Sequence, residues 1–322
     1  MSTPQQEVTE RLGKIFMPYA VSRRDDMISR DWRFVHYTSA ESAIKIIRTE
    51  EIWLRNAKCM NDYTEVSHGH EQLSRFFDKN RELFTRVLNR FGNQIAESTL
   101  KLFDQWWNEI QFNTFICSIS EHNPGEDNNG RLSMWRAYGQ SSAKAAIVLK
   151  IPLEPSDFAD RLRVYLSPVA YFGYADVERN LLAVMKNISD NAEFLGSIDA
   201  NHLANTMFMT LLMAAVSLKH AGFKEEREWR ALYLPNLAPS SLVTREIETI
   251  NSVPQIVYKV PLKNNQAERI TGLSVPELIE RIIIGPSSYP WPLFEAFKTT
   301  LEQAGVENAG SRVIVSGIPL RT

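Results

Sequence analysis

The chain has 322 residues, of which 44% are hydrophobic and 23% are charged, as is typical of a soluble globular protein large enough to bury a substantial core. Its formal net charge of −2 gives no bulk attraction to nucleic acid or to a membrane surface. Two cysteines are too few for a disulfide framework or a thiolate zinc site. With a polar N-terminus and no apolar run of the ~20 residues that span a bilayer, we expect a cytoplasmic protein without membrane contact.

The first thirty residues are expected to be peripheral. An amphipathic pattern over residues 5–17 predicts a short helix, and a polar connector follows it to Arg30. We therefore expect residues 1–30 to form an N-terminal helix and connector, and residues 31–322 to form a single α/β domain.

The next segment predicts a strand that leads into a helix. Trp32 to Thr38 is rich in aromatic and β-branched residues, which favours a strand. Thr38 and Glu41 have the spacing of a capping box, so a helix should follow at once. His36, Tyr37 and Thr38 would then lie near a helix N-terminus, a place suited to an anionic ligand. A lone histidine there is also compatible with a purely structural role.

A helical insertion is predicted after a second short strand at residues 52–55. A polar loop carries Asn61, Asp62 and Glu65, and the helical pattern then continues without a strand over about residues 64–112. We expect this insertion to pack against the main body of the domain.

The remaining elements alternate between strands and helices, which predicts an α/β (α+β) fold with one mixed central β-sheet. The expected strands are residues 114–120, 145–151, 162–165, 255–260, 280–284 and 312–315, and the expected helices are residues 131–138, 175–188, 192–220 and 292–304.

The stretch from 222 to 234 turns from a charged segment into an apolar, strand-like one. If it is extended, Glu226, Glu228 and Arg230 share one face. Two neighbouring carboxylates repel each other unless a cation lies between them, so such a pair is typical of sites that bind a cation or a charged transition state. A charged edge strand that blocks aggregation would have the same pattern.

Several common catalytic motifs are absent from the sequence. It has no glycine-rich phosphate loop and no Gly-x-Ser-x-Gly elbow, so kinases, P-loop enzymes and the common serine hydrolases are disfavoured. His68 and His70 point to different sides of their helix, so no metal site is predicted there.

A set of short motifs resembles the bacterial domain-of-unknown-function 2971 family over about residues 34–286. The motifs are Val35-His36-Tyr37-Thr38-Ser39, Asn61-Asp62-x-x-Glu65, Phe115-x-Cys117-Ser118, Met134-Trp135-x-x-Tyr138-Gly139, Lys219 before Phe223-x-x-Glu226-x-Glu228-x-Arg230, and Ile283-Ile284-Gly285. Their order and spacing carry the resemblance, and the family label itself assigns no function.

A more distant resemblance is to ADP-ribosyltransferases, including DNA-modifying toxins with a His-x-Thr first strand. It implies NAD as the substrate, a protein or nucleic acid as the acceptor of ADP-ribose, and a role as a toxin or phage-defence effector. The implied catalytic residues are Glu228, Glu226 and His36, and the implied NAD-binding residues are His36, Tyr37, Thr38, Trp135, Tyr138 and Ser118.

Within this resemblance each residue has an expected role. Glu228 would stabilise the positive charge that develops on the ribose when the nicotinamide bond breaks, with Glu226 as its partner. His36 and Thr38 would hold ribose or phosphate, and Trp135 or Tyr138 would offer a stacking face. Replacing Glu228 with glutamine should abolish NAD turnover and leave folding intact.

Two other functions remain open from the sequence. One is a metal-dependent nuclease in which Asp62, Glu226 and Glu228 bind Mg²⁺, with Lys219 or Lys224 near these carboxylates. The other is a non-enzymatic nucleotide-binding or sensor module, in which Glu226, Glu228 and Arg230 form a structural ion network. The oligomeric state is also open.

Overall fold

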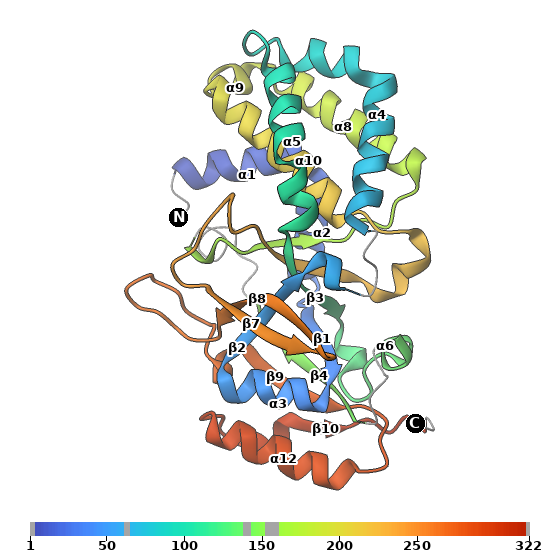
Figure 1. The fold of residues 1–322 in the computed structure, drawn as a ribbon, viewed down its shortest axis with the longest axis vertical. Coiled ribbons are helices and arrows are strands. Elements are labelled where there is room, and N and C mark those ends of the chain that lie inside the picture. Colours follow the sequence, from blue (N-terminus) through green and yellow to red (C-terminus); the bar gives the residue numbers. More distant parts are fainter. Residues whose placement is uncertain (1–3, 61–64, 138–142, 152–160, 320–322) are drawn as a thin grey trace.

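The computed structural model describes residues 4–60, 65–137, 143–151 and 161–319. Most helices gather at one end of an elongated molecule, and the sheet occupies the middle and the other end (Figure 1). This arrangement of helices around a mixed sheet confirms the predicted mixed α/β class.

The elements follow one another along the whole described chain. The helices are α1 (Pro4–Phe16), α2 (Pro18–Ser29), α3 (Ala40–Thr49), α4 (Glu65–Leu88), α5 (Ile95–Phe112), α6 (Leu132–Ala137), α8 (Tyr174–Asp190), α9 (Ala192–Gly196), α10 (Ala200–Ser217), α11 (Val275–Leu278) and α12 (Pro290–Gln303). The strands are β1 (Arg33–Ser39), β2 (Glu51–Asn56), β3 (Phe115–His122), β4 (Lys144–Leu149), β5 (Tyr165–Pro168), β6 (Glu228–Tyr233), β7 (Thr244–Ile250), β8 (Val253–Pro261), β9 (Ile279–Ile284) and β10 (Val313–Val315).

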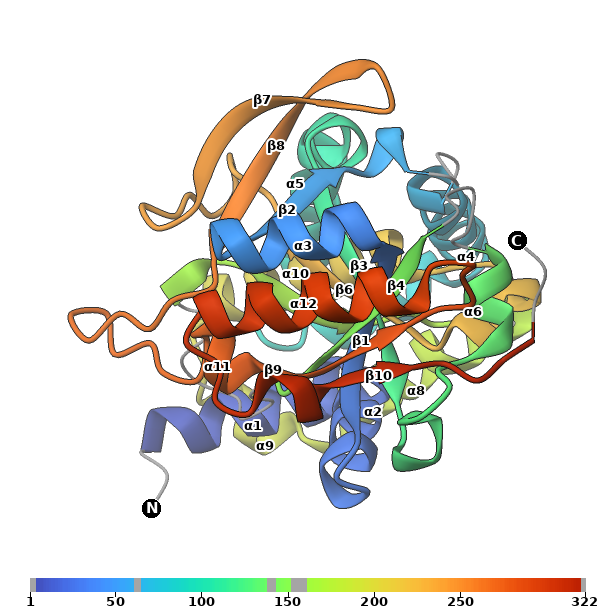
Figure 2. The same ribbon diagram turned by 90° about the horizontal axis from the view of Figure 1, so that it is seen from below.

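The sheet has the order β10-β9-β4-β1-β3-β2-β8-β7, with β6 paired to β3 and β5 paired to β6 as a branch. Strands β9 and β10 are parallel, and the other pairs are antiparallel. All six residues of β4 are buried, because its alternate side chains enter cores on opposite faces of the sheet. Helices α3 and α12 lie side by side over one of these faces (Figure 2).

Strands β1 and β2 share one edge of β3 but diverge from each other. β1 pairs with the end of β3, where Val35 lies opposite Ser120, and β2 pairs with its start, where Arg55 lies opposite Ile116. On this edge of β3, which faces away from β6, no described strand pairs with residues 117–119. The sheet therefore opens at the middle of β3.

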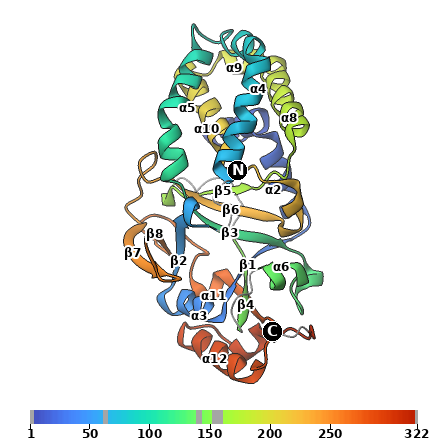
Figure 3. The same cartoon turned by 45° about the vertical axis from the view of Figure 1, so that its right-hand side comes forward.

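The helical end has its own core, which lies above β3, β5 and β6 (Figure 3). Helix α10 packs against α4 and α5, and α1 packs into the same core through Leu12, Ile15 and Phe16. Gly69 lets the backbones of α4 and α10 come into contact, because a Cβ atom at this position would lie 2.0 Å from the carbonyl oxygen of Ala215 in α10. No helix among the described residues is long and apolar enough to cross a membrane.

Local predictions at helix ends were partly wrong. The expected polar connector is helix α2, which buries only Met27 and so lacks a clear apolar stripe. The N-cap of α3 is Ser39 and not Thr38, since the Ser39 hydroxyl accepts a hydrogen bond from the Ser42 N–H at 3.1 Å. The helix expected at 192–220 is two helices, because the Asp199 carboxylate caps a new start at α10.

Strand β7 was missed entirely. It pairs only with β8, and its first four residues are exposed. A strand that buries so little side-chain surface has no apolar alternation to reveal it.

Candidate functional site

The opening in the sheet is a cleft with a volume of about 390 Å³. Side chains from several strands line it, among them His36 and Thr38 of β1, Ser118 of β3 and Glu228 of β6. They meet because β1 and β6 pair with opposite edges of β3. An imidazole and a carboxylate that are 192 positions apart, by their residue numbers, thus share one cavity.

Glu228 is the most strongly held group of the cleft, with a side chain only 4% exposed. Its Oε1 accepts hydrogen bonds from the Ser118 hydroxyl at 2.6 Å and from Arg230 Nε at 3.0 Å. Its Oε2 accepts from Lys219 Nζ, also at 3.0 Å. The backbone N–H of Glu228 donates to the Tyr171 hydroxyl at 2.8 Å. The carboxylate is therefore fixed in both position and direction.

The ionisation of Glu228 is set by these neighbours. Burial by itself raises the pKa of this carboxyl, but the charges of Arg230 and Lys219 and the hydrogen bonds from Arg230 and Ser118 lower it to about 2. The group is therefore an anion throughout the neutral range.

This lowered pKa predicts an acid-dependent stability. Because the folded pKa of Glu228 is about 2 and its unfolded value about 4.5, the carboxylate stabilises the fold fully above about pH 4.5 and loses this effect as the pH falls toward 2. At about 1.4 kcal/mol for each pH unit, the contribution is roughly 3 kcal/mol. Urea unfolding of the natural protein and of Glu228→Gln between pH 7 and pH 3 should give a difference that shrinks with acid. A difference that stays constant would contradict the ion-pair origin of the pKa.

Glu226 does not lie on a strand beside Glu228, as the sequence analysis expected. It ends a 3-10 turn, Ala221–Glu226, and Arg227 then adopts a left-handed φ of 44° before β6 begins. The two carboxylates are nevertheless joined, because Lys219 Nζ lies 2.7 Å from Glu226 Oε2 and 3.0 Å from Glu228 Oε2. The cation that the like-charged pair requires is this lysine.

His36 bridges the opening between the strands. Its Nδ1 lies 2.9 Å from the Ser118 carbonyl oxygen, and since a carbonyl only accepts, Nδ1 carries the proton. Burial lowers the pKa of His36, which favours the neutral ring, and Nε2 is then an acceptor. Such a ring suits a hydroxyl donor and not an anion.

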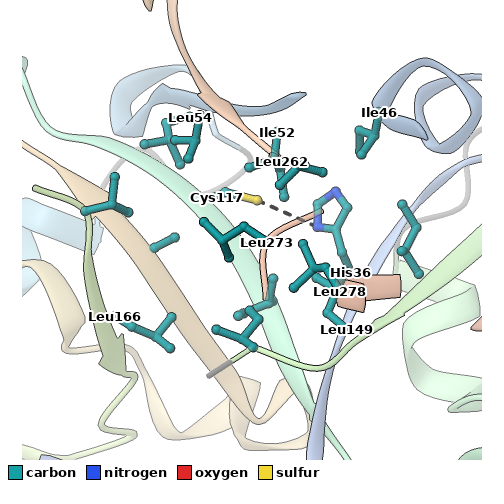
Figure 4. A pocket seen from close by; sticks show the side chains of 16 residues that line it. His36, Ile46, Ile52, Leu54, Cys117, Leu149, Leu166, Leu262, Leu273 and Leu278 are labelled. Atoms are coloured by element: carbon teal, nitrogen blue, oxygen red, sulfur yellow. Dashed lines mark hydrogen bonds between the residues drawn. The ribbon is translucent and has the colours of Figure 1, made fainter. Parts of the chain in front are cut away.

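A small apolar chamber of about 60 Å³ lies behind His36 (Figure 4). His36, Cys117, Ile46 and Ile52 line both this chamber and the cleft. Burial raises the pKa of Cys117 to about 12, so its sulfur is a neutral thiol and not a nucleophile.

Of the remaining predicted binding residues, Tyr37 also lines the cleft and Trp135 does not. The Tyr37 hydroxyl accepts from the Arg131 N–H at 2.8 Å, and burial raises its pKa to about 12. Trp135 is only 1% exposed, and its ring N–H donates to the Asn129 carbonyl, so the expected stacking face is not available. Tyr138 lies outside the described residues. Met134 and Ala137 of the same segment do line the cleft.

The predicted site residues left out the part of the cleft formed by α3 and β2. Lys45, Trp53 and Arg55 line the cleft, and Lys45 Nζ lies 4.0 Å from the centre of a Trp53 ring. Their signal in the sequence is the alternation of Trp53 and Arg55 with the apolar Ile52 and Leu54 along β2. Trp53 thus supplies a partly exposed aromatic ring in place of Trp135.

The nuclease hypothesis predicts a lysine near its carboxylates, and Lys219 lies there. The Lys219 ammonium lies between Glu226 and Glu228, where that hypothesis places a divalent cation. Its third ligand, Asp62, lies outside the described residues.

No protein-family model, curated protein or solved structure matches this chain.

Proposed function

We propose that the cleft binds NAD and that the chain breaks its nicotinamide–ribose bond, transferring ADP-ribose to a macromolecular acceptor or to water. The observation that carries this proposal is the shared cleft of His36 and Glu228, built where β1 and β2 part. A volume of about 390 Å³ lies within the roughly 300–1,000 Å³ usual for small-molecule sites. This arrangement supports the ADP-ribosyltransferase-like fold as part of the same proposal.

The reaction needs a fixed negative charge more than a proton donor. When the C1′–N bond breaks, its electron pair leaves with neutral nicotinamide, and positive charge develops on the ribose. The ionised, preorganised carboxylate of Glu228 stabilises that charge. The acceptor oxygen or nitrogen then bonds to C1′ and releases its proton to Glu226, whose carboxylate shares the Lys219 ammonium with Glu228. His36 Nε2 and the Thr38 hydroxyl accept hydrogen bonds from the ribose hydroxyls.

The direct test is incubation of the full chain with NAD. Chromatography should show release of nicotinamide, and NAD labelled on the adenine should report either free ADP-ribose or a labelled acceptor. A protein that neither binds NAD nor consumes it, in the presence of nucleic acid and of cell extract, would overturn the proposal.

Ser118 is expected to act as a positioning residue. Replacing it with alanine removes the 2.6 Å hydrogen bond to Glu228 Oε1, so the carboxylate loses direction while keeping its charge. We expect NAD turnover to fall about 10- to 100-fold with little change in KM, because the bond supports the transition state more than substrate binding. Ser120→Ala is the matched control, since Ser120 lies on the same strand and lines the same cleft. Equal losses in both variants would contradict this role.

A second candidate function is nucleotide binding without turnover. Both oxygens of Glu228 are already held by Ser118, Lys219 and Arg230, as in a structural ion network. Calorimetric binding of NAD with no nicotinamide release would favour this function over the transferase.

A further inference from the structure

A second cavity, with a volume of about 630 Å³, lies in the helical end, apart from the cleft. Its walls come from α1, α2, α8 and α10, and β5 closes its inner end. The cleft and this cavity share none of their described lining residues. Whatever occupies the second cavity does not compete directly with a ligand in the cleft.

The chemistry of the wall selects an uncharged, apolar ligand body. None of the described lining residues is a lysine, arginine, aspartate or glutamate. A charged group inside would lose its hydration without a counter-charge, which costs several kcal/mol. Met17, Met209 and Met213 supply flexible, polarizable side chains that adapt to a chain with many conformations.

The cavity is long because it follows helix α10. Lining residues extend from His202 to Ser217, which is about 22 Å at 1.5 Å for each of 15 residue steps. A long acyl chain spans about half of the roughly 30 Å hydrocarbon core of a bilayer, so an extended or gently bent chain fits this length.

The walls also carry the polar side chains of Thr9, Asn180, Thr206 and Thr210, and further polar groups lie at the two ends of the cavity. At the inner end the Ser217 hydroxyl donates to the Ser167 hydroxyl at 2.9 Å, so these buried groups satisfy each other. At the outer end His202 and Asn205 are exposed. A small polar head would therefore lie at His202 and Asn205 in contact with water, with the chain directed inward.

The cavity opens to solvent, so its largely apolar wall is in contact with water until an apolar molecule covers it. Removing apolar surface from water is favourable, and even a closed apolar cavity of ~150 Å³ takes up apolar molecules. We infer that this cavity binds one long-chain aliphatic amphiphile, a fatty acid or fatty alcohol, with its chain along α10 and its head at His202.

The test uses the full chain and a fluorescent fatty acid, 11-(dansylamino)undecanoic acid. We expect saturable binding of one probe per chain with a micromolar Kd, and displacement by lauric acid or by dodecanol. Stronger displacement by the acid identifies a fatty acid as the ligand, and stronger displacement by the alcohol identifies a fatty alcohol.

Two variants fill the cavity from two different helices. Gly13→Leu adds bulk from α1, where a Cβ atom meets only Val21 at 3.5 Å, and Ala214→Phe adds bulk from α10. Each should weaken probe binding at least tenfold, whereas Asn201→Leu on the exposed side of α10 should not change it. Absence of saturable binding, or unchanged binding in both folded variants, would overturn the inference.

Discussion

Replacing Arg230 with methionine is expected to destabilise the protein by about 3–5 kcal/mol, the usual effect of removing one partner from a buried ion pair. Arg230 is 1% exposed, and its guanidinium donates to both the Glu228 carboxylate and the Val216 carbonyl. Methionine fills much of the space but leaves the carbonyl without this donor and the carboxylate with fewer cations. Urea unfolding at pH 7, followed by circular dichroism, measures the loss.

Arg48→Met is the matched control for this change. Arg48 is exposed on α3, so the same substitution there should change the unfolding free energy by less than about 0.5 kcal/mol. If Arg230→Met were as stable as the control, the ion cluster would contribute little, and Glu228 would have to be held by other contacts.

Replacing Glu228 with glutamine is expected to lower NAD turnover by about 10²- to 10³-fold, because a neutral amide cannot stabilise the charge on the ribose. The same change leaves Arg230 and Lys219 with less compensation in a buried site. It should therefore also destabilise the fold by roughly 3 kcal/mol at pH 7. The structure thus revises the expectation that glutamine leaves folding intact. Turnover is compared with the folded fraction measured at the same temperature.

Two controls separate the catalytic effect of Glu228 from its structural one. Glu225→Gln changes an exposed carboxylate of the same turn and should keep full activity and stability. Glu228→Asp keeps the charge but withdraws it by one methylene, so it should recover part of the stability while turnover stays low. Turnover that tracks the folded fraction in all three variants would assign Glu228 a structural role alone.

Strongly patterned elements could be predicted from the sequence. The apolar runs of β4 and α10 were predicted as a buried strand and a buried helix and are so in the structure, although the helix predicted at 192–220 is divided in two. Elements that bury little, such as α2 and β7, left no such pattern and were missed.

The site was harder to predict than the fold. The sequence indicated which residue types could form it, and the structure places His36 and Glu228 together. It could not indicate the direction of Trp135, because a six-residue helix has too few turns to define its buried face. Nor could it show that Lys219 joins Glu226 to Glu228, since that contact depends on how the turn after α10 folds.

The His36 side chain has both a structural role, through its hydrogen bond to Ser118, and a role in the cleft. The imidazole replaces a missing rung of the β-ladder at the place where β1 and β2 separate, and it also presents an acceptor to the cleft. A related chain that lost histidine here would need another donor for the Ser118 carbonyl, and asparagine or glutamine could serve. A substitution of His36 that changes ligand recognition would therefore also remove a hydrogen bond between β1 and β3.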